Sequence, residues 1–307
     1  YKVSIIKLLK INYKPFQGLY ILRFGGHIMS YVDLHVHSNA SDGTLSPEQV
    51  VRLAHEAGLS AIALTDHDTT AGVAGAAEAG AELGLEVVPG IEVSSSFRDH
   101  EIHILGLFVD TDSPSLQAAL KEFRHHRDQR NQEMLGRFDA HGIHLTAEDL
   151  CAGNPDTVIT RAHVARALLA KGLGPDLDHI FKKYLQYGGT YCPPKEFLPP
   201  EAVMEALLDS HAFVALAHPF QYKLGDKATE ELIAYLAGLG MKGLEVYHSS
   251  HNRLESAKLQ EMAARHHLLS TGGSDFHGSN KPDISIGTGR GGLRVSSLLL
   301  DAIKNTL

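Results

Sequence analysis

Short apolar runs alternate with amphipathic stretches along the chain from residue 31 onward. Such runs predict buried strands, and the amphipathic stretches between them predict helices that cross from one strand to the next. The expected strands are YVDLH (31–35), AIALT (61–65), EVVPGIEVS (86–94), EIHILGLFV (101–109), AFVALAH (212–218), GLEVYH (243–248) and LLSTGGSDFH (268–277). Seven strands with helical crossovers predict an α/β fold with a parallel sheet, and their number suits a barrel.

The first two expected helices have clear end signals. Ser46-Pro47-Glu48-Gln49 forms a capping box with proline at the first helical position, and the helix is expected to end at Gly58. The second helix consists mostly of small residues and is expected to end at Gly84.

The alternation stops between residues 110 and 200. A long charged helix is expected near 114–140, a turn and helix start around 160–163, and another helix at 176–187. The proline-rich stretch YCPPKEFLPP (191–200) leads back to the strand pattern. We therefore expect residues 111–200 to form a helical insertion that covers one face of a barrel built from residues 29–110 and 201–307.

The first 28 residues differ in composition from the rest. They contain no acidic residue, and their basic residues are Lys2, Lys7, Lys10, Lys14 and Arg23. Lysines interrupt the apolar stretches and no small-residue cleavage pattern follows, so a signal peptide is not favoured. We expect Met29 to be the natural start and residues 1–28 to be a non-native or disordered leader.

Composition limits the classes of partner. The 307 residues contain 28 basic and 36 acidic side chains, a formal net charge of −8. Phosphate backbones bind basic surfaces, so we expect no stable nucleic-acid partner. No apolar run reaches the roughly 20 residues of a membrane-spanning helix, so we expect no membrane association. The two distant cysteines, Cys151 and Cys192, suggest a reducing compartment and a cytoplasmic location.

Each expected strand delivers a histidine or carboxylate within it, at its carboxyl end or in the loop that follows. In parallel α/β folds the active site lies at that edge of the sheet. His35 and His37 alternate with apolar residues and therefore point to one side, which Asp33 shares as a possible supporting residue. The candidate metal ligands are His35, His37, Asp42, His67, Glu92, His103, His218, Asp275 and His277.

Each of these motifs has a simpler explanation when taken alone. His-x-His is more often two hydrogen-bonded polar residues, His103 could be a core histidine, and the stretch 66–68 could be a polar turn. Together they would require several coincidences on one rim, and the crowded groups would repel or lack partners without cations. A multinuclear metal site explains all of them. Imidazole with carboxylate suits Zn²⁺, Mn²⁺ or Fe²⁺, and the absence of thiolate ligands argues against a closed structural zinc.

The motifs DLHVHSNASDGTLSP, ALTDHDT, PGIEVS, HILGLF, AHP and GSDFHG resemble, in order, those of the PHP (polymerase and histidinol phosphatase) family of metallophosphoesterases. The resemblance covers residue 31 to about 280. It implies a distorted seven-stranded barrel that holds two or three divalent metals, with Mn²⁺ favoured and Zn²⁺ or Fe²⁺ as alternatives. It implies one metal on His35, His37, Glu92 and Asp275, a second on Glu92, His103 and His218, and a third on Asp42, His67 and His277.

Asp42 stands where many relatives have histidine. This aspartate, the insertion and GLEVYHSSH (243–251) resemble the branch that includes 3′,5′-nucleotide bisphosphatases and a 5′-to-3′ exoribonuclease that acts on short RNA. The resemblance implies hydrolysis of the 3′-phosphate of nucleoside 3′,5′-bisphosphates. The alternative is exoribonuclease activity on short 5′-phosphorylated RNA, and a histidinol-phosphatase-like activity fits less well.

Two other classes are disfavoured by the residues present. Amidohydrolases share the first His-x-His and a late aspartate, but they commonly have a bridging lysine where this chain has Glu92. A non-catalytic module that keeps the fold should have lost ligands, and none is missing here.

The expected mechanism is phosphate ester hydrolysis assisted by two metals, with Glu92 bridging them and His218 or Asp275 protonating the leaving alcohol. Substrate phosphate could be bound by residues in the insertion or near the late strands: Arg161, His163, His248, His251 and Lys281. Arg161 and Lys281 could equally be solvated surface residues. The stretch 121–137 is expected to be a charged, solvated helix face, because acidic residues interleave with the basic ones. The native metal and the oligomeric state stay open.

Overall fold

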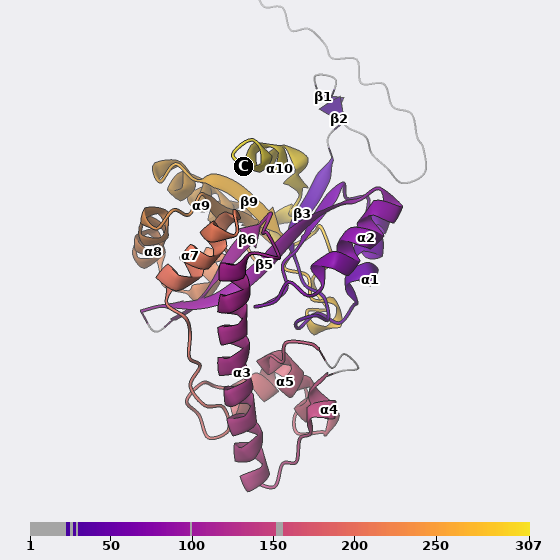
Figure 1. Ribbon diagram of the computed structural model, residues 1–307, viewed down its shortest axis with the longest axis vertical. Coiled ribbons are helices and arrows are strands. Elements are labelled where there is room, and N and C mark those ends of the chain that lie inside the picture. Colours follow the sequence, from indigo (N-terminus) through magenta and orange to yellow (C-terminus); the bar gives the residue numbers. More distant parts are fainter. Residues whose placement is uncertain (1–22, 25–26, 29, 99, 152–155) are drawn as a thin grey trace, which may run out of the picture.

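A computed structural model describes residues 23–24, 27–28, 30–98, 100–151 and 156–307 (Figure 1). Its centre is one eight-stranded sheet with the order β10-β3-β4-β5-β6-β7-β8-β9. These strands are β3 (Tyr31–Val36), β4 (Ala61–Leu64), β5 (Glu86–Phe97), β6 (His100–Leu107), β7 (Phe213–Leu216), β8 (Gly243–His248), β9 (Leu269–Gly273) and β10 (Val295–Ser296). A separate pair, β1 (Arg23–Phe24) and β2 (His27–Ile28), is the described part of the expected leader, whose other residues lie outside the described ranges.

The seven strands β3 to β9 form a nearly closed barrel, as the motifs predicted. Each strand pairs with the next one along the chain, and a parallel bridge between Val36 and Phe276 joins the segment after β9 to β3. The amide of Asp275 also donates to the carbonyl of His35 over 2.8 Å. The late aspartate and the first histidine motif are therefore neighbours in space.

The predicted barrel is present, but the prediction of a parallel sheet is wrong for three strand pairs of the described sheet. β6 runs antiparallel to both β5 and β7, and β10 runs antiparallel to β3. β6 begins three positions after β5 ends at Phe97, so no crossover helix fits between them. His103 consequently lies within β6, opposite Ser94 of β5, rather than at a carboxyl strand end. The two-residue β10 is too short to leave a periodic signal.

Helices in the described part of the chain pack around the barrel (Figure 1). They are α1 (Pro47–Glu56), α2 (Val73–Leu83), α7 (Pro200–Asp209), α8 (Asp226–Gly238), α9 (Arg253–Arg265) and α10 (Ser297–Lys304). The predicted capping box at α1 is confirmed, because the Gln49 amide donates to Ser46 Oγ and the Ser46 amide donates to Gln49 Oε1. Short 3₁₀ turns lie at η1 (Pro219–Tyr222), η2 (Gly278–Asn280) and η3 (Arg290–Gly292).

A second group of helices extends away from the barrel. It contains α3 (Pro114–Ala140), α4 (Ala147–Cys151), α5 (Arg161–Ala170) and α6 (Leu177–Tyr184). In Figure 1, α4 and α5 lie beside the half of α3 that is far from the barrel. These helices share a hydrophobic core of their own, in which Met134, Phe138 and Leu168 are fully buried. This arrangement supports the proposed division into a barrel and a helical insertion. No helix in the described ranges is long and apolar enough to cross a membrane.

Candidate metal centre

Glu92 on β5 lies at the centre of a buried cluster of imidazoles, and its own side chain is fully buried. Its Oε1 lies 2.8 Å from His218 Nε2 and 2.9 Å from His103 Nδ1. The same oxygen lies 3.4 Å from His35 Nε2. One carboxylate oxygen therefore contacts side chains from β3, from β6 and from the turn after β7.

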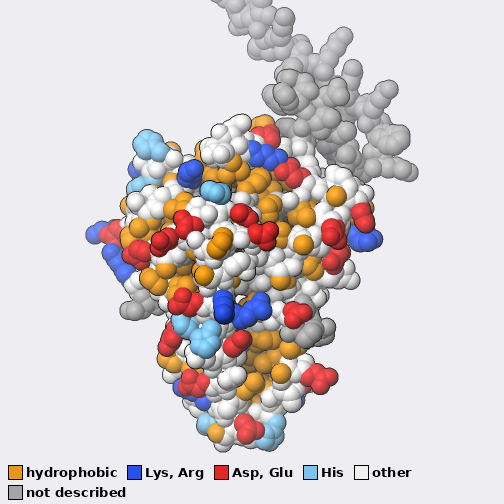
Figure 2. Space-filling view, viewed as in Figure 1, with side chains coloured by type: hydrophobic (Ala, Val, Ile, Leu, Met, Phe, Trp, Pro, Cys, Tyr) orange, Lys and Arg blue, Asp and Glu red, His pale blue; other side chains and the backbone are white. Residues whose placement is uncertain are grey.

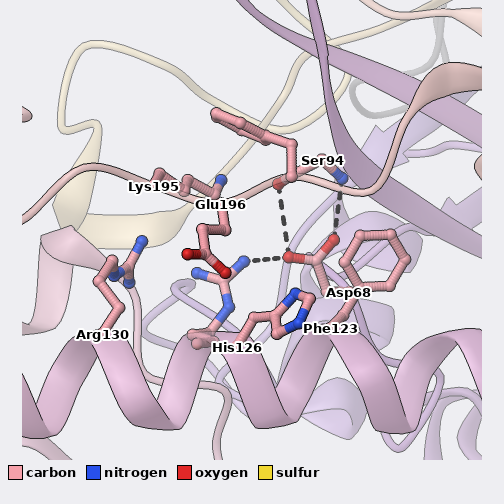
Figure 3. Close-up of a pocket in the computed structure, with 9 residues that line it drawn as sticks. Asp68, Ser94, Phe123, His126, Arg130, Lys195 and Glu196 are labelled. Carbon is pink, nitrogen blue, oxygen red and sulfur yellow. Dashed lines mark hydrogen bonds and ion pairs between the residues drawn. The ribbon is translucent and has the colours of Figure 1, made fainter.

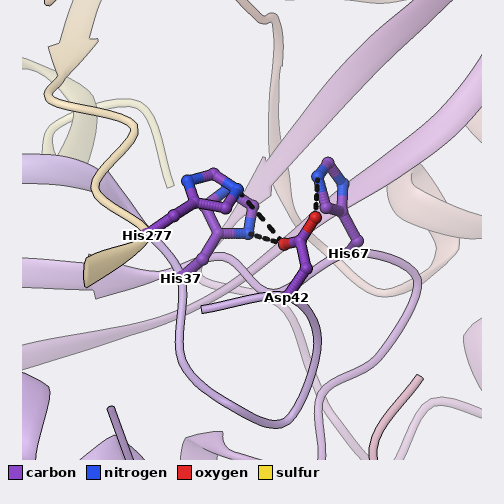
Figure 4. Close-up of side chains that lie close together, drawn as sticks. All are labelled: His37, Asp42, His67 and His277. Carbon is purple, nitrogen blue, oxygen red and sulfur yellow. Dashed lines mark ion pairs between the residues drawn. The ribbon is translucent and has the colours of Figure 1, made fainter. Parts of the chain in front are cut away.

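The other oxygen of Glu92 faces a second set of rings. Oε2 lies 3.0 Å from His67 Nδ1 and 3.3 Å from His37 Nε2. Asp42 lies among the same rings, with Oδ1 3.1 Å from His277 Nε2 and Oδ2 3.8 Å from His67 Nε2 (Figure 4). His37 Nδ1 is 3.9 Å from Asp42 Oδ1, so His37 contacts both carboxylates.

Asp275 completes the cluster from the loop after β9. Its Oδ1 lies 3.5 Å from His37 Nε2 and 3.7 Å from His35 Nε2. Its Oδ2 lies 2.5 Å from Lys281 Nζ and 3.4 Å from His248 Nε2. The carboxylate thus lies between the His35 and His37 rings on one side and a lysine on the other.

The backbone is strained at two of these positions. His218 has a φ of 26° and Asp275 has a φ of 57°, in the left-handed region that non-glycine residues rarely adopt. Each strained amide is held by a hydrogen bond, from His218 to Glu245 Oε2 over 2.7 Å and from Asp275 to the carbonyl of His35 over 2.8 Å. Strain of this kind persists only where the surroundings impose it, and it is frequent at functional sites.

All nine predicted ligands lie in this one cluster. Among the described residues, ligand atoms within 4.8 Å of one another form the groups His37–Asp42–His67–His277, His35–Glu92–His218, His35–His37–Asp275, His67–Glu92–His103 and His35–Glu245–His248. The first group contains the predicted third ligand set together with His37. The group of Glu92 and His103 includes His67, whereas the resemblance placed His103 with His218.

The charges in the cluster suit divalent cations. Burial alone would lower the pKa of His103 and His35, but Glu92 raises the pKa of His103 to about 10, and Glu245 with Glu92 raises that of His35 well above its usual value. The carboxylates therefore favour a positively charged group or ion beside them. Burial lowers the pKa of His218 to about 4, so this ring offers a neutral nitrogen.

Several atoms in the cluster form no hydrogen bond of normal geometry with the described residues, although an imidazole nitrogen or a carboxylate oxygen lies 3.0–3.9 Å from each of them. They include Glu92 Oε2, Asp42 Oδ1 and His37 Nδ1, all buried. His35 Nε2 and His37 Nε2 lie only 3.1 Å apart, although two imidazole lone pairs repel unless a proton or cation lies between them. Converging buried nitrogen and oxygen atoms without hydrogen bonds of normal geometry fit divalent metal binding.

A basic pocket lies beside this cluster (Figure 3). Its lining residues are Asp68, Ser94, Phe123, His126, Arg127, Arg130, Lys195, Glu196 and Phe197. Arg127 donates to Asp68, the residue that follows His67, and Lys195 donates to Glu101, whose Oε1 is 3.5 Å from His103 Nε2.

Arg130 differs from its two basic neighbours in having no carboxylate partner in the described part of the chain. Its Nη2 donates to Asn131 Oδ1 over 2.9 Å, and its buried Nε has no hydrogen-bond partner there. Burial and then Arg127 lower the pKa of Arg130, and burial lowers the pKa of Lys195 to about 8. Figure 2 shows Lys and Arg side chains gathered at the junction of the barrel and the helical segment.

The comparison with known proteins assigns the family. Residues 33–191 match the family model described as PHP domain. The chain belongs to the PHP family. The family predicted from the motifs is confirmed.

Similar proteins are named for more than one phosphoesterase activity. The chain is 35% identical over 261 residues to the 3′,5′-nucleoside bisphosphate phosphatase of Chromobacterium violaceum, covering 84% of this chain and 91% of that protein. It is 36% identical over 250 residues to the 5′-3′ exoribonuclease Rnm of Escherichia coli strain K12, covering 80% and 84%. A solved structure from Bifidobacterium adolescentis, described as a proposed metal-dependent phosphoesterase, matches with a TM-score of 0.79 and 30% identity, covering 89% and 95%.

Two of the residues predicted to bind substrate phosphate, Arg161 and His163, make contacts within the protein. The Arg161 guanidinium lies 3.7 Å from the Tyr187 ring centroid, and Nη1 donates to the carbonyl of Leu185 over 3.2 Å. His163 is buried at the start of α5, where its Nδ1 accepts from the Thr160 amide over 3.0 Å. Burial lowers the pKa of His163 to about 4, so the ring carries no positive charge at neutral pH.

The other three residues predicted to bind substrate phosphate contact the metal cluster or pack beside a residue that does. His248 and Lys281 both contact Asp275. His251 is buried, its Nδ1 lies 3.1 Å from the carbonyl of Val246, and its ring lies 5.2 Å from that of His248.

The prediction that 121–137 is a solvated helix face is wrong for two residues. Arg127 and Arg130 are only 8% and 6% exposed. They follow Phe123 at intervals of four and seven residues, so they share the buried side of α3. The interleaved acids gave α3 the composition of a surface helix, and only the packing of α3 onto the PHP barrel buries these arginines.

Three buried carboxylates, Asp66, Asp33 and Glu245, accept hydrogen bonds from residues that carry or adjoin the proposed metal ligands. Asp66 accepts from the Ser38 amide over 2.8 Å and from the Ser38 and Ser41 hydroxyls over 2.6 Å each, which fixes the loop that carries Asp42. Asp33, considered a supporting residue from its face, accepts from the Ser274 amide over 2.8 Å rather than from an imidazole. Glu245 on β8 was missed, although a single acid between apolar residues in GLEVYH is a usable signal.

Proposed function

We propose that this protein removes the 3′-phosphate from nucleoside 3′,5′-bisphosphates with the help of two or three divalent metal ions. The observation that carries the proposal is the contact between two sites, because Glu101 touches both Lys195 of the basic pocket and His103 of the cluster. One substrate phosphate would lie at the cluster and the other in the pocket. At the level of class, the predicted phosphoric ester hydrolase is confirmed by the family and by the names of its relatives.

The proposed metal ligands are the nine cluster residues, with Glu92 shared between metals. Imidazole and carboxylate donors suit Mn²⁺, and Zn²⁺ or Fe²⁺ are alternatives. When bound, such ions neutralise phosphate oxygens and lower the pKa of a coordinated water. The protein fixes the ligand positions through buried hydrogen bonds, including those to Asp66 and Glu245.

The proposed catalytic residues are Glu92, His218 and Asp275. His218 Nε2 faces Glu92 Oε1 at 2.8 Å, and with a pKa of about 4 the ring is neutral at neutral pH. Burial alone would raise the pKa of Asp275. Lys281 and then the neighbouring histidines lower this pKa well below its usual value, so the carboxyl is ionised. Either group could protonate the leaving alcohol only after taking up a proton in the site. Lys281, 2.5 Å from Asp275, is placed to contact a phosphate at the cluster.

The second phosphate would bind to Arg130 and Lys195. A guanidinium presents paired donors that match phosphate oxygens, and Arg130 has no carboxylate in the described structure to satisfy it. The rings of Phe123 and Phe197 line the same pocket and offer apolar surface to the nucleoside. We therefore propose Arg130 and Lys195 as the phosphate contacts in place of Arg161 and His163.

The test compares two substrates with Mn²⁺-loaded protein and an EDTA-treated control. We expect rapid 3′-phosphate release from 3′-phosphoadenosine 5′-phosphate and slow turnover of a short 5′-phosphorylated RNA. Arg130→Gln should raise KM for the bisphosphate and leave KM for adenosine 3′-monophosphate unchanged. Arg124→Gln, an exposed position on the same helix, is the matched control. Equal effects of Arg130→Gln on both substrates would contradict the pocket assignment.

The second candidate is 5′-to-3′ exoribonuclease activity on short 5′-phosphorylated RNA. The observation in its favour is the 36% identity to the Escherichia coli exoribonuclease, which is close to the 35% identity to the phosphatase. Stepwise release of mononucleotides from the RNA 5′ end, faster than bisphosphate hydrolysis, would establish it. In either case the proposed substrate is a nucleotide or a short RNA, and we propose no stable nucleic-acid partner for the protein. Cys151 and Cys192 form no disulfide in the structure, which fits the proposed cytoplasmic location.

A further inference from the structure

Glu245 is fully buried on β8 and contacts two of the nine proposed ligands. Its Oε1 lies 3.0 Å from His35 Nδ1, and its Oε2 accepts the backbone N–H of His218 over 2.7 Å. His35 comes from β3, and His218 follows β7. One carboxylate on a third strand therefore binds two distant segments of the chain.

The first contact decides which nitrogen of His35 faces the cluster. An ionised carboxylate only accepts hydrogen bonds, so His35 Nδ1 must carry the proton that it shares with Glu245. Glu245 has the geometry of such an acceptor, because its Oε2 accepts the His218 amide while its Oε1 faces His35 Nδ1. When the ring is neutral its lone pair is then on Nε2, which lies 3.4 Å from Glu92 Oε1.

The second contact holds the backbone of His218. Its φ of 26° lies outside the common regions for a residue with a Cβ. The hydrogen bond from the His218 N–H to Glu245 stabilises this backbone conformation. In this conformation the His218 ring has its Nε2 2.8 Å from Glu92 Oε1. Without an acceptor at this point the buried amide would lack a partner, and the turn could relax.

We propose that Glu245 is a positioning residue that sets the tautomer of His35 and the turn of His218, and thereby the divalent-metal affinity of the cluster. This inference rests on the proposed function only in that the cluster binds a divalent ion. Both oxygens of Glu245 are used in these contacts, so its role is to orient ligands. Loss of such a supporting hydrogen bond to a metal-binding histidine lowers metal affinity by about 10–100-fold.

Glu245→Gln tests the tautomer directly. The glutamine oxygen can accept from the His218 amide, and its NH₂ group then faces His35 Nδ1. The ring nitrogen must now accept, so the proton moves to Nε2 and the lone pair leaves the cluster. We expect the Kd for Mn²⁺, measured by titration calorimetry, to rise by about 10–100-fold. In metal-free protein at a pH where His35 is neutral, the imidazole ¹⁵N shifts of His35 should change from an Nδ1–H to an Nε2–H pattern.

Two further variants separate positioning from a general loss of stability. Glu245→Asp keeps an acceptor-only group and should retain the Nδ1–H pattern, with Mn²⁺ affinity nearer to the wild type than that of Glu245→Gln. Asp33→Asn removes another buried carboxylate, one whose side-chain oxygens accept from Ser274, from Gly287 and from the backbone amide of His35, but not from the His35 ring. It should leave the His35 ring pattern unchanged whatever it does to stability.

An unchanged ¹⁵N pattern and an unchanged Mn²⁺ Kd in Glu245→Gln would overturn the inference. If Glu245→Gln does not fold, a changed His35 pattern in Glu245→Asp overturns it, and a retained pattern supports it. The proposed function fails separately, when wild-type protein binds Mn²⁺ and leaves the bisphosphate intact. Wild-type protein that binds no divalent ion overturns both.

Discussion

Arg127 of α3 donates a hydrogen bond to Asp68, and both side chains are buried. Asp68 also accepts the Ser94 amide over 2.8 Å. The ion pair therefore connects the helical segment to the loop after β4 and, through Asp68, to β5, immediately beside His67. Because the basic pocket has walls from both parts, its shape depends on this connection.

Arg127→Met should destabilise the protein by about 3–5 kcal/mol, because it leaves the Asp68 carboxylate buried without its cation. Urea unfolding measures the free energy of unfolding. Arg124→Met, on the exposed side of the same helix, should change it by less than about 0.5 kcal/mol. A loss below about 1 kcal/mol for Arg127→Met would mean that water or another cation replaces the arginine.

The apparent affinity for the bisphosphate should fall above about pH 8. Burial lowers the pKa of Lys195 from 10.5 to about 8, although Glu101 opposes the shift. Above this pH the native state loses the ammonium that contacts the phosphate, so KM should rise while kcat changes little. Lys195→Arg keeps its charge and should show a flat KM from pH 7 to 9. A wild-type KM that is equally flat would exclude Lys195 from phosphate binding.

The same group gives a signed effect on stability. Between pH 8 and 10.5 the unfolded lysine still binds its proton while the native one has lost it. Stability contributed by this residue therefore rises with pH across that interval. Lys195→Met should remove this rise in urea unfolding experiments, whereas Lys121→Met, at an exposed position on α3, should retain it.

Glu92→Gln should abolish turnover and reduce metal content while leaving the fold largely intact. The amide keeps the shape of Glu92 but removes the charge that two sets of imidazoles share. We expect kcat/KM to fall by at least about a thousandfold, or about 4 kcal/mol in the barrier. Glu86→Gln, at the exposed start of the same strand, is the control. Full activity of Glu92→Gln, with metal analysis unchanged, would remove its bridging role.

Phe138→Ala should affect substrate binding more than metal binding. Phe138 is fully buried and stacks on Tyr191, with ring centroids 4.8 Å apart. Truncating a buried phenylalanine costs about 3–5 kcal/mol, and here the cost falls on the separate core of the helical segment. Hydrogen exchange should rise in α3 to α6 and KM should rise. Mn²⁺ affinity should stay constant, because all nine proposed ligands lie outside residues 111–200.

Phe213→Ala is the matched variant in the barrel. Phe213 is 1% exposed and is the first residue of β7, the strand that leads to His218. It should lower Mn²⁺ affinity together with stability. Equal losses of Mn²⁺ affinity in Phe138→Ala and Phe213→Ala would show that the two cores unfold as one unit.

The sequence by itself determined the family, the seven strands of the barrel and the set of residues that gather at its rim. Those features are local, because a strand leaves an apolar run and His-x-His places two rings on one side of it. The capping box of α1 was readable for the same reason, since its partners Ser46 and Gln49 are three residues apart. The metal roles of the rim residues stay predictions.

Only the tertiary structure decided which groups support and surround that rim. Glu245 and His35 are 210 residues apart, and no spacing rule connects them. Arg127 and Arg130 occur in a stretch with the composition of a surface helix, and they are buried because α3 packs its Phe123 side against the barrel. The reversed direction of β6 likewise follows from its short connection to β5 and not from its apolar pattern. Periodicity specifies which side of an element is buried, whereas the partner it meets depends on how the whole chain packs.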